Sequence, residues 1–133
     1  MTNKYNFSTL SEQLLNTVHR DLNILAHEVL KISPIDFSIT EGYRSKKRQE
    51  YLYKEGKSKT LNSKHTELRA IDICPYINNK LDYEATNDLF IIIGIFMAKA
   101  KELNINIRVG ALWDNDSVKN NDFVDGYHVE LVE

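Results

Sequence analysis

The sequence predicts an α+β domain in which a small, mainly antiparallel sheet packs with two long helices. Apolar residues recur at helical spacing in two segments, and four or five short runs have the composition or the alternation of strands. Helices and strands do not alternate strictly along the chain, which favours an α+β arrangement over a parallel α/β one. At 133 residues, the chain is predicted to form one domain, residues 1–133, with a core of its own.

The first long helix is expected to begin after Thr9, which opens a capping box, T-L-S-E. It should end before Pro34, because the residue ahead of a proline is displaced from the helical region. His19 and His27 fall on this segment without ligand-like neighbours, and we interpret them as structural or solvated. The apolar stripe that predicts the helix is Leu14, Val18, Leu22, Leu25 and Val29.

Short elements are expected between the two long helices. In the strand beginning at Ala70, alternation places Asp72 and Cys74 on one face and Ile71 and Ile73 on the other. The expected elements are a strand at 36–40, a helix capped by Ser45 that runs to about Lys54 and stops near Gly56, a strand at 70–75, and a turn at 77–80.

The second long helix is predicted from Glu84 to about Asn104. Its middle, L-F-I-I-I-G-I-F-M-A, is apolar nearly all round, so we expect other elements to cover it on more than one side. A strand from Ile105 to Trp113 follows, and a short strand from His128 to Val132 comes near the end of the chain. We expect the strands that carry Asp72 and His128 to be neighbours in the sheet.

Charge and composition limit the partners and the location of the chain. The formal net charge is −2 with no basic block, so a nucleic acid is not an expected partner. The single Cys excludes an internal disulfide framework. The most apolar run, Leu89 to Ala98, is about half of a membrane span, and the N-terminus has no apolar signal region. We expect a monomer, synthesised in the cytoplasm without a signal peptide and not inserted in a membrane.

Two histidines and an aspartate form a candidate metal site. His65 and Asp72 lie seven residues apart, and Asp72 falls within an apolar run, where a carboxylate is costly unless it is paired or binds a metal. With His128 they form a three-ligand set for a catalytic zinc ion, which leaves one position for water. The alternative for Asp72 is a buried carboxylate held by hydrogen bonds or by an arginine, and Cys74 is interpreted as a small buried apolar residue.

Two further side chains are candidates for catalysis. Asp125, three residues before His128, is placed to take a proton from water and pass it to a leaving amine. Arg44, at a strand-to-helix junction, is the candidate for stabilising the oxyanion, although an arginine in such a position is more often a surface ion pair. The Asp- and Asn-rich segment 114–122 lacks the full spacing of a calcium loop, and a solvated loop is the favoured interpretation over an ion site.

Several motifs resemble the zinc peptidases that cleave D-amino-acid-containing peptides of bacterial cell walls. This group includes D-alanyl-D-alanine carboxypeptidases and phage endolysins that are L-alanyl-D-glutamate peptidases, and the chain is most similar to the endolysin branch. The motifs cover nearly the whole chain: S-x-H at 63–65, A-I-D-x-x-P-Y-I-N at 70–78, D-G-x-H-V-E-L at 125–131, S-P-x-D-F-x-I at 33–39, G-Y-R at 42–44 and R-x-G-A-x-W at 108–113.

The resemblance implies a zinc DD-peptidase-like fold and a zinc-dependent endopeptidase of the peptidoglycan stem peptide, cutting the L-Ala–D-Glu bond during host cell lysis. The alternatives are a D,D-carboxypeptidase and a non-catalytic zinc-binding domain that recognises the cell wall. By the resemblance, Trp113 and Ser63 contact the substrate, and Glu130 supports the site. The family pattern has Gly where this chain has Leu68; if that position needs a positive φ, a leucine there is strained. The resemblance assigns the roles of zinc ligands (His65, Asp72, His128), acid/base (Asp125) and substrate-polarising arginine (Arg44).

Overall fold

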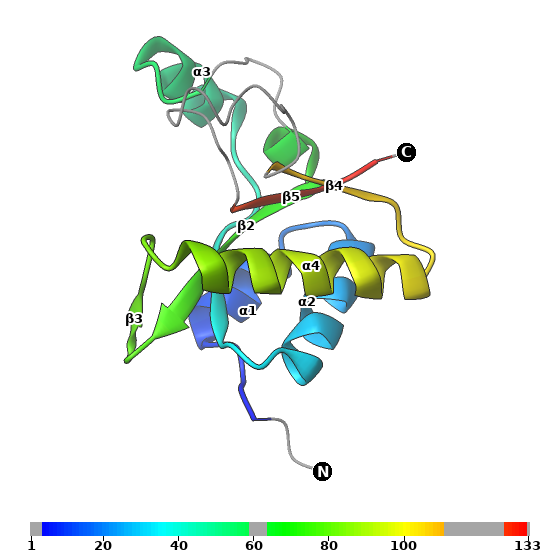
Figure 1. The fold of residues 1–133 in the computed structure, drawn as a ribbon. Coiled ribbons are helices and arrows are strands. Elements are labelled where there is room, and N and C mark those ends of the chain that lie inside the picture. The colour runs from blue at the N-terminus through cyan, green and yellow to red at the C-terminus, as the bar shows by residue number, and fades with distance from the viewer. Residues whose placement is uncertain (1–3, 59–63, 111–126, 133) are drawn as a thin grey trace.

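The computed structural model describes residues 4–58, 64–110 and 127–132. Within them, one five-stranded antiparallel sheet is surrounded by four α-helices and a short 3-10 helix (Figure 1). This confirms the predicted α+β class. The predicted site residues Ser63, Trp113 and Asp125, and the segment 114–122, lie outside the described residues.

The sheet has the strand order β1-β2-β5-β4, with β3 paired to the far end of β2. Strand β2 is central. Its residues 72–75 pair with β1, residues 70–72 pair with β5, and residues 76–77 pair with β3. A two-residue turn joins β2 to β3, and both of its residues, Asn78 and Asn79, have positive φ, as such hairpin turns require. The strands are β1 Phe37–Glu41, β2 Ala70–Ile77, β3 Lys80–Leu81, β4 Ile107–Val109 and β5 His128–Leu131.

Helices α1, α2 and α4 lie on the core side of this sheet. Helix α4 contacts both α2 and the strands β2 and β4, and α1 packs against β1. Alternate strand residues point into the core between these layers, among them Phe37, Ile71, Ile73 and Val129. The helices are α1 Thr9–Leu15, α2 Arg20–Ile32, α3 Lys46–Lys54, α4 Thr86–Glu102 and the 3-10 helix η1 Lys64–Glu67.

The first predicted helix is two helices, so the single continuous helix was wrong. Ser8, not Thr9, caps α1 by accepting a hydrogen bond from the Ser11 N–H. The chain leaves the helix after Leu15, where the Leu14 carbonyl accepts from both the Thr17 N–H at 3.1 Å and the Thr17 hydroxyl at 2.6 Å. His19 then caps α2, because its Nδ1 accepts from the Asp21 N–H. The apolar stripe continues through the break, which is why spacing alone did not reveal it.

Helix α4 is covered on one side, which corrects the expectation of several covered sides. Leu89, Ile92, Phe96 and Ala100 face the core. On the outer side Phe90, Ile91 and Met97 are 46%, 48% and 42% exposed. Because the helix is apolar on both sides, composition could not distinguish the buried side from the exposed one. No helix among the described residues has the length and apolar character needed to cross a membrane.

Candidate metal centre

One face of the sheet packs into the hydrophobic core, and the other face carries the candidate metal site. Residues with odd numbers in β2 and β5 point into the core, and those with even numbers point to the opposite face. Asp72 and His128 are direct cross-strand partners in the antiparallel β2–β5 pair. The predicted neighbourhood of these two strands is therefore confirmed, and register alone brings the carboxylate beside the imidazole.

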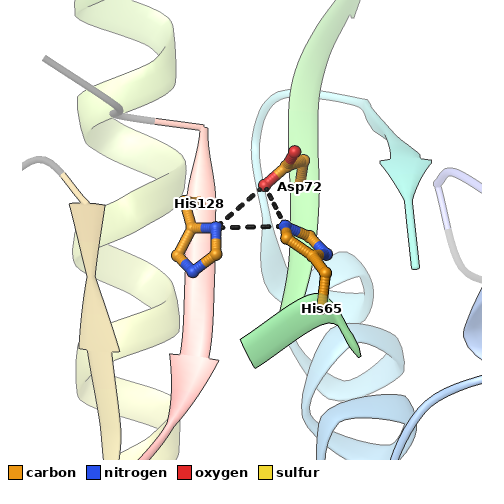
Figure 2. Close-up of side chains that lie close together, drawn as sticks. All are labelled: His65, Asp72 and His128. Carbon is orange, nitrogen blue, oxygen red and sulfur yellow. Dashed lines mark hydrogen bonds and ion pairs between the residues drawn. The ribbon is translucent and has the colours of Figure 1, made fainter. Parts of the chain in front are cut away.

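His65 completes the group from outside the sheet. It lies on η1 and its side chain is 1% exposed. Its Nε2 is 3.1 Å from Asp72 Oδ1 and 3.1 Å from His128 Nδ1, and Asp72 Oδ1 is 3.2 Å from His128 Nδ1 (Figure 2). The three residues predicted as ligands thus form one compact triangle of nitrogen and oxygen atoms.

The outer nitrogens of both imidazoles are engaged with acceptors. His65 Nδ1 is 2.9 Å from the Gly42 carbonyl oxygen, so it must carry a proton and donate. His128 Nε2 lies 2.9 Å from Glu130 Oε1 and donates to that carboxylate. The inner nitrogens, His65 Nε2 and His128 Nδ1, then face Asp72, and in their unprotonated form they are the atoms through which these histidines can bind a metal.

This donor set fits a tetrahedral metal ion. Three acceptor atoms converge on one point, where they repel one another unless a cation lies between them. Zinc with ligand distances of about 2.0–2.1 Å has tetrahedral edges of roughly 3.3–3.4 Å, close to the three separations here. The three atoms therefore occupy positions that match one face of such a tetrahedron, and no further His, Cys, Asp or Glu among the described residues joins this group.

Asp72 is in the ionised form that a metal requires. Burial alone would raise the pKa of Asp72, but in the metal-free protein hydrogen bonds donated by protonated His128 and His65 outweigh it and hold that pKa well below its usual range. A metal ion would take the place of those protons beside the same ionised carboxylate. By contrast, burial raises the pKa of the Cys74 thiol to about 11. Cys74 is fully buried and neutral, which agrees with its interpretation as a small apolar residue rather than a ligand.

The Glu130 carboxylate, to which the family resemblance gave only a supporting role, holds His128 in place. Glu130 is 4% exposed, and burial by itself would raise its pKa; the hydrogen bond from His128 and the positive charge of Arg108 outweigh this and lower it. Arg108 lies on the neighbouring strand β4, and its Nη2 is 3.2 Å from Glu130 Oε2. Glu130 is therefore an ionised acceptor that orients the imidazole.

The Gly42–Arg44 segment holds His65 from the other side. Besides the Gly42 carbonyl, which accepts from the imidazole, the Arg44 N–H donates to the His65 carbonyl at 3.1 Å. Only glycine fits at position 42, since a Cβ there would lie 2.6 Å from the Leu14 carbonyl oxygen and 2.7 Å from Thr17 Oγ1. The end of α1 thus fixes the loop that fixes His65.

The Arg44 guanidinium forms a bidentate ion pair with the Glu41 carboxylate, close to the metal centre. Its Nε and Nη2 donate to the two carboxylate oxygens of Glu41 at 2.7 and 2.6 Å, and Nη1 donates to Gln49 Oε1 at 2.6 Å. Glu41 is the cross-strand partner of Asp72 across the β1–β2 pair. Arg44 therefore lies close to the site on a rigid support, in a bidentate ion pair whose arginine side chain is only 10% exposed.

Sequence reasoning missed Glu41 and Gln49 as members of this network. Gln49 is fully buried, although it lies in a helix composed largely of charged residues. Glu41 stands directly before the G-Y-R motif, and that position was the one available signal. Neither residue has a recognisable partner until the chain folds.

Leu68 has the strained conformation that the missing glycine predicted. Its φ is +63°, in the left-handed region that side chains other than glycine rarely adopt. The backbone there is held by the hydrogen bond from the His19 N–H to the Leu68 carbonyl at 2.8 Å. The loop between His65 and Asp72 therefore keeps this backbone conformation, although it is strained for a leucine at position 68.

Comparison with known proteins places the chain in a family. The sequence model of the family described as phage L-alanyl-D-glutamate peptidase matches residues 3–132. The chain belongs to this family. It is 35% identical over 136 residues to the L-alanyl-D-glutamate peptidase of Escherichia phage T5, covering 96% of this chain and 98% of that protein.

Solved structures agree with this assignment. The L-Ala D-Glu endopeptidase ChiX of Serratia marcescens superposes with a TM-score of 0.83 at 28% identity, covering 97% of this chain and 92% of that one. The vancomycin-resistance D,D-dipeptidase VanXYg matches with a TM-score of 0.52 at 15% identity, over 86% of this chain and 50% of that one. The second match shows a shared fold, and both confirm the predicted zinc DD-peptidase-like architecture.

Proposed function

We propose that this chain is a zinc-dependent endopeptidase that hydrolyses the L-Ala–D-Glu bond of the peptidoglycan stem peptide. The convergence of His65 Nε2, Asp72 Oδ1 and His128 Nδ1 within 3.2 Å of one another carries the proposal. Two ligand types that zinc prefers are present, and the geometry leaves room for water or substrate on the open side. The named activity of the phage T5 relative supplies the scissile bond.

We assign zinc to His65, Asp72 and His128. A zinc ion bound there supplies a Lewis acid and lowers the pKa of water toward 7, so that hydroxide is available at neutral pH. Gly42 and Glu130 contribute by holding the two imidazoles with their lone pairs inward. Both histidines are buried and the Asp72 side chain is 20% exposed, so the site has a lower dielectric than water and charge stabilisation there is stronger.

The remaining roles follow from the family motifs and stay proposals. We assign Asp125 as the acid/base that accepts a proton from water and returns it to the leaving amine. Arg44 would polarise the attacked carbonyl; its bonds to Glu41 and Gln49 use three of its five N–H groups, and two remain for the substrate. Trp113 and Ser63 are proposed to contact the substrate.

The physiological setting is that of a phage endolysin, acting on the cell wall after release from the host cytoplasm. Residues 1–133 are proposed to act as one catalytic domain. All three ligands come from one chain, which supports a monomer as the active unit. The net charge of −2 gives no electrostatic reason to bind a nucleic acid.

Digestion of one defined muropeptide tests the proposal. Mass spectrometry of the products should show cleavage between L-Ala and D-Glu, lost with a chelator and restored by zinc. Release of free D-Ala with an intact L-Ala–D-Glu bond would instead support the D,D-carboxypeptidase. Asp125→Ala should keep zinc and lose hydrolysis. If the wild-type protein binds zinc but hydrolyses no muropeptide, the result would support the alternative of a non-catalytic wall-binding domain.

A further inference from the structure

A groove of about 470 Å³ lies beside strands β1 and β2, away from the metal centre. Three serines and a threonine line it with hydroxyl groups, and two tyrosines line it with aromatic rings. The lining side chains that matter here are Ser8, Ser38, Thr40, Tyr76, Leu81 and Tyr83. Hydroxyl groups beside aromatic faces suit a ligand that has both polar edges and apolar patches.

The groove and the metal centre share one face of the sheet. Asp72, Cys74 and Tyr76 alternate along β2 and therefore point to the same side. Ser38 is the cross-strand partner of Cys74 and lies on that side too. Four residues of strand span roughly 13 Å, so Tyr76 marks a point that far from the ligand Asp72 along the surface of the sheet.

Tyr83 lines the groove and contacts a neighbour of the metal centre. Its ring packs edge-on against the ring of Tyr127, with 5.4 Å between centroids, and Tyr127 directly precedes the ligand His128. Burial raises the pKa of Tyr83, so its hydroxyl stays protonated. Tyr83 is 54% exposed, which leaves part of its ring free for a ligand.

Charge distinguishes the two ends of the site. Among the described residues that line the groove, Asp36 is the one charged side chain, and none is a cation. The opposite end carries Arg44, Lys64 and the basic first turn of α3. Figure 1 shows α3 and β3 at opposite ends of the molecule, with β2 and β5 between them.

The proposed substrate has a matching asymmetry. From D-Glu onward the stem peptide carries carboxylates, which favour the cationic end. On its other side, L-Ala is joined through a lactyl group to N-acetylmuramic acid, whose remaining ring is neutral and rich in hydroxyl groups. L-Ala and the lactyl group are equivalent to two extended residues, or about 7 Å, which brings the sugar to the level of Cys74, where the groove begins.

We propose that this groove is a subsite for the N-acetylmuramic acid of peptidoglycan, with Tyr83 as the aromatic wall that contacts the sugar ring. The subsite rests on the proposed function, because it assumes cleavage next to the glycan-linked L-Ala. It makes the protein selective for stem peptides that are still attached to the glycan strand over free peptides.

Two substrates with the same scissile bond test the subsite. One is N-acetylmuramyl-L-Ala-γ-D-Glu-diaminopimelate, and the other is the same peptide with only a lactyl group on L-Ala. The wild-type protein should have a kcat/KM at least about tenfold higher for the sugar-bearing substrate, as expected when one aromatic contact and its hydrogen bonds are added. This ratio requires no variant, so it does not depend on how a substitution folds.

Variants at Tyr83 locate the effect. Tyr83→Leu should remove most of the preference by lowering kcat/KM for the sugar substrate alone, whereas Tyr83→Phe should keep it. The matched control is Tyr53→Leu on α3, since Tyr53 has a similar exposure of 46%; this variant should leave kcat/KM unchanged for both substrates. Equal hydrolysis of both substrates by the wild-type protein, or an equal loss on both with Tyr83→Leu, would overturn the subsite. Failure to cut either substrate at L-Ala–D-Glu would overturn the proposed function instead.

Discussion

Replacing Gly42 by alanine tests whether the end of α1 positions the metal centre. The added Cβ would lie 2.6 Å from the Leu14 carbonyl oxygen and 2.7 Å from Thr17 Oγ1, both shorter than the 3.4 Å at which ordinary contact begins. Neither atom can move freely. The Thr17 hydroxyl donates to the Leu14 carbonyl, and the same hydroxyl oxygen accepts from the Tyr43 N–H at 3.0 Å.

The expected loss of stability follows from these contacts. Overpacking of this kind costs about 1–3 kcal/mol, and breaking one of the hydrogen bonds adds about 1 kcal/mol, so Gly42→Ala should lower the free energy of unfolding by roughly 2–4 kcal/mol. For a chain of this length that is a fall in Tm of roughly 6–15 °C. Zinc affinity should fall as well, because the Gly42 carbonyl accepts the hydrogen bond from His65.

Urea and thermal unfolding measure the effect, and Gly94→Ala provides the control. Gly94 lies on the exposed side of α4, and a Cβ there would meet nothing within 4 Å. Since alanine is the better helix former, Gly94→Ala should raise the free energy of unfolding by about 0.5–1 kcal/mol. A Gly42→Ala protein as stable as the wild type, with unchanged zinc affinity, would refute the argument that α1 fixes this loop.

Three further predictions concern the loop and the ligands. Glu130→Ala should weaken zinc binding roughly 10- to 100-fold by freeing the His128 imidazole, measured by competition with a chelator; wild-type affinity would contradict the orienting role. Leu68→Gly should raise the free energy of unfolding by up to about 1 kcal/mol, because relief of the left-handed strain exceeds the cost of the added entropy of the unfolded chain. A lower free energy of unfolding in urea would contradict the presence of that strain. Without metal, stability should decline as pH falls below the ordinary Asp72 pKa of 3.8, since the unfolded carboxylate takes up its proton first, and Asp72→Asn should lose this dependence in urea titrations at pH 3–7.

Local sequence signals predicted most of the secondary structure, for identifiable reasons. Ser45 caps α3 as expected, and Gly56 follows the end of that helix with a φ of +75°. The alternation in β2 correctly divided Asp72 from Ile71 and Ile73. Each of these features depends on a few neighbouring residues, so the sequence contains all that decides it.

The two errors in the fold arose where distant residues decide the outcome. The break between α1 and α2 is held by the hydrogen bond from the His19 N–H to the Leu68 carbonyl, nearly fifty positions along the chain. The one-sided burial of α4 depends on the layer of helices and strands available to cover it. Periodicity records neither of these long-range contacts.

By itself, the sequence predicted that His65, Asp72 and His128 form one site and that the strands carrying Asp72 and His128 are neighbours, and the family motif predicted the strain at Leu68; the structure brings the three residues together and gives Leu68 a positive φ. Only the tertiary structure decided which nitrogen of each imidazole faces inward. That choice depends on the Gly42 carbonyl and the Glu130 carboxylate, which reach the two histidines from other parts of the fold. It likewise decided that Arg44 pairs with Glu41 and the buried Gln49, since a side chain that long can reach several partners and only packing selects among them.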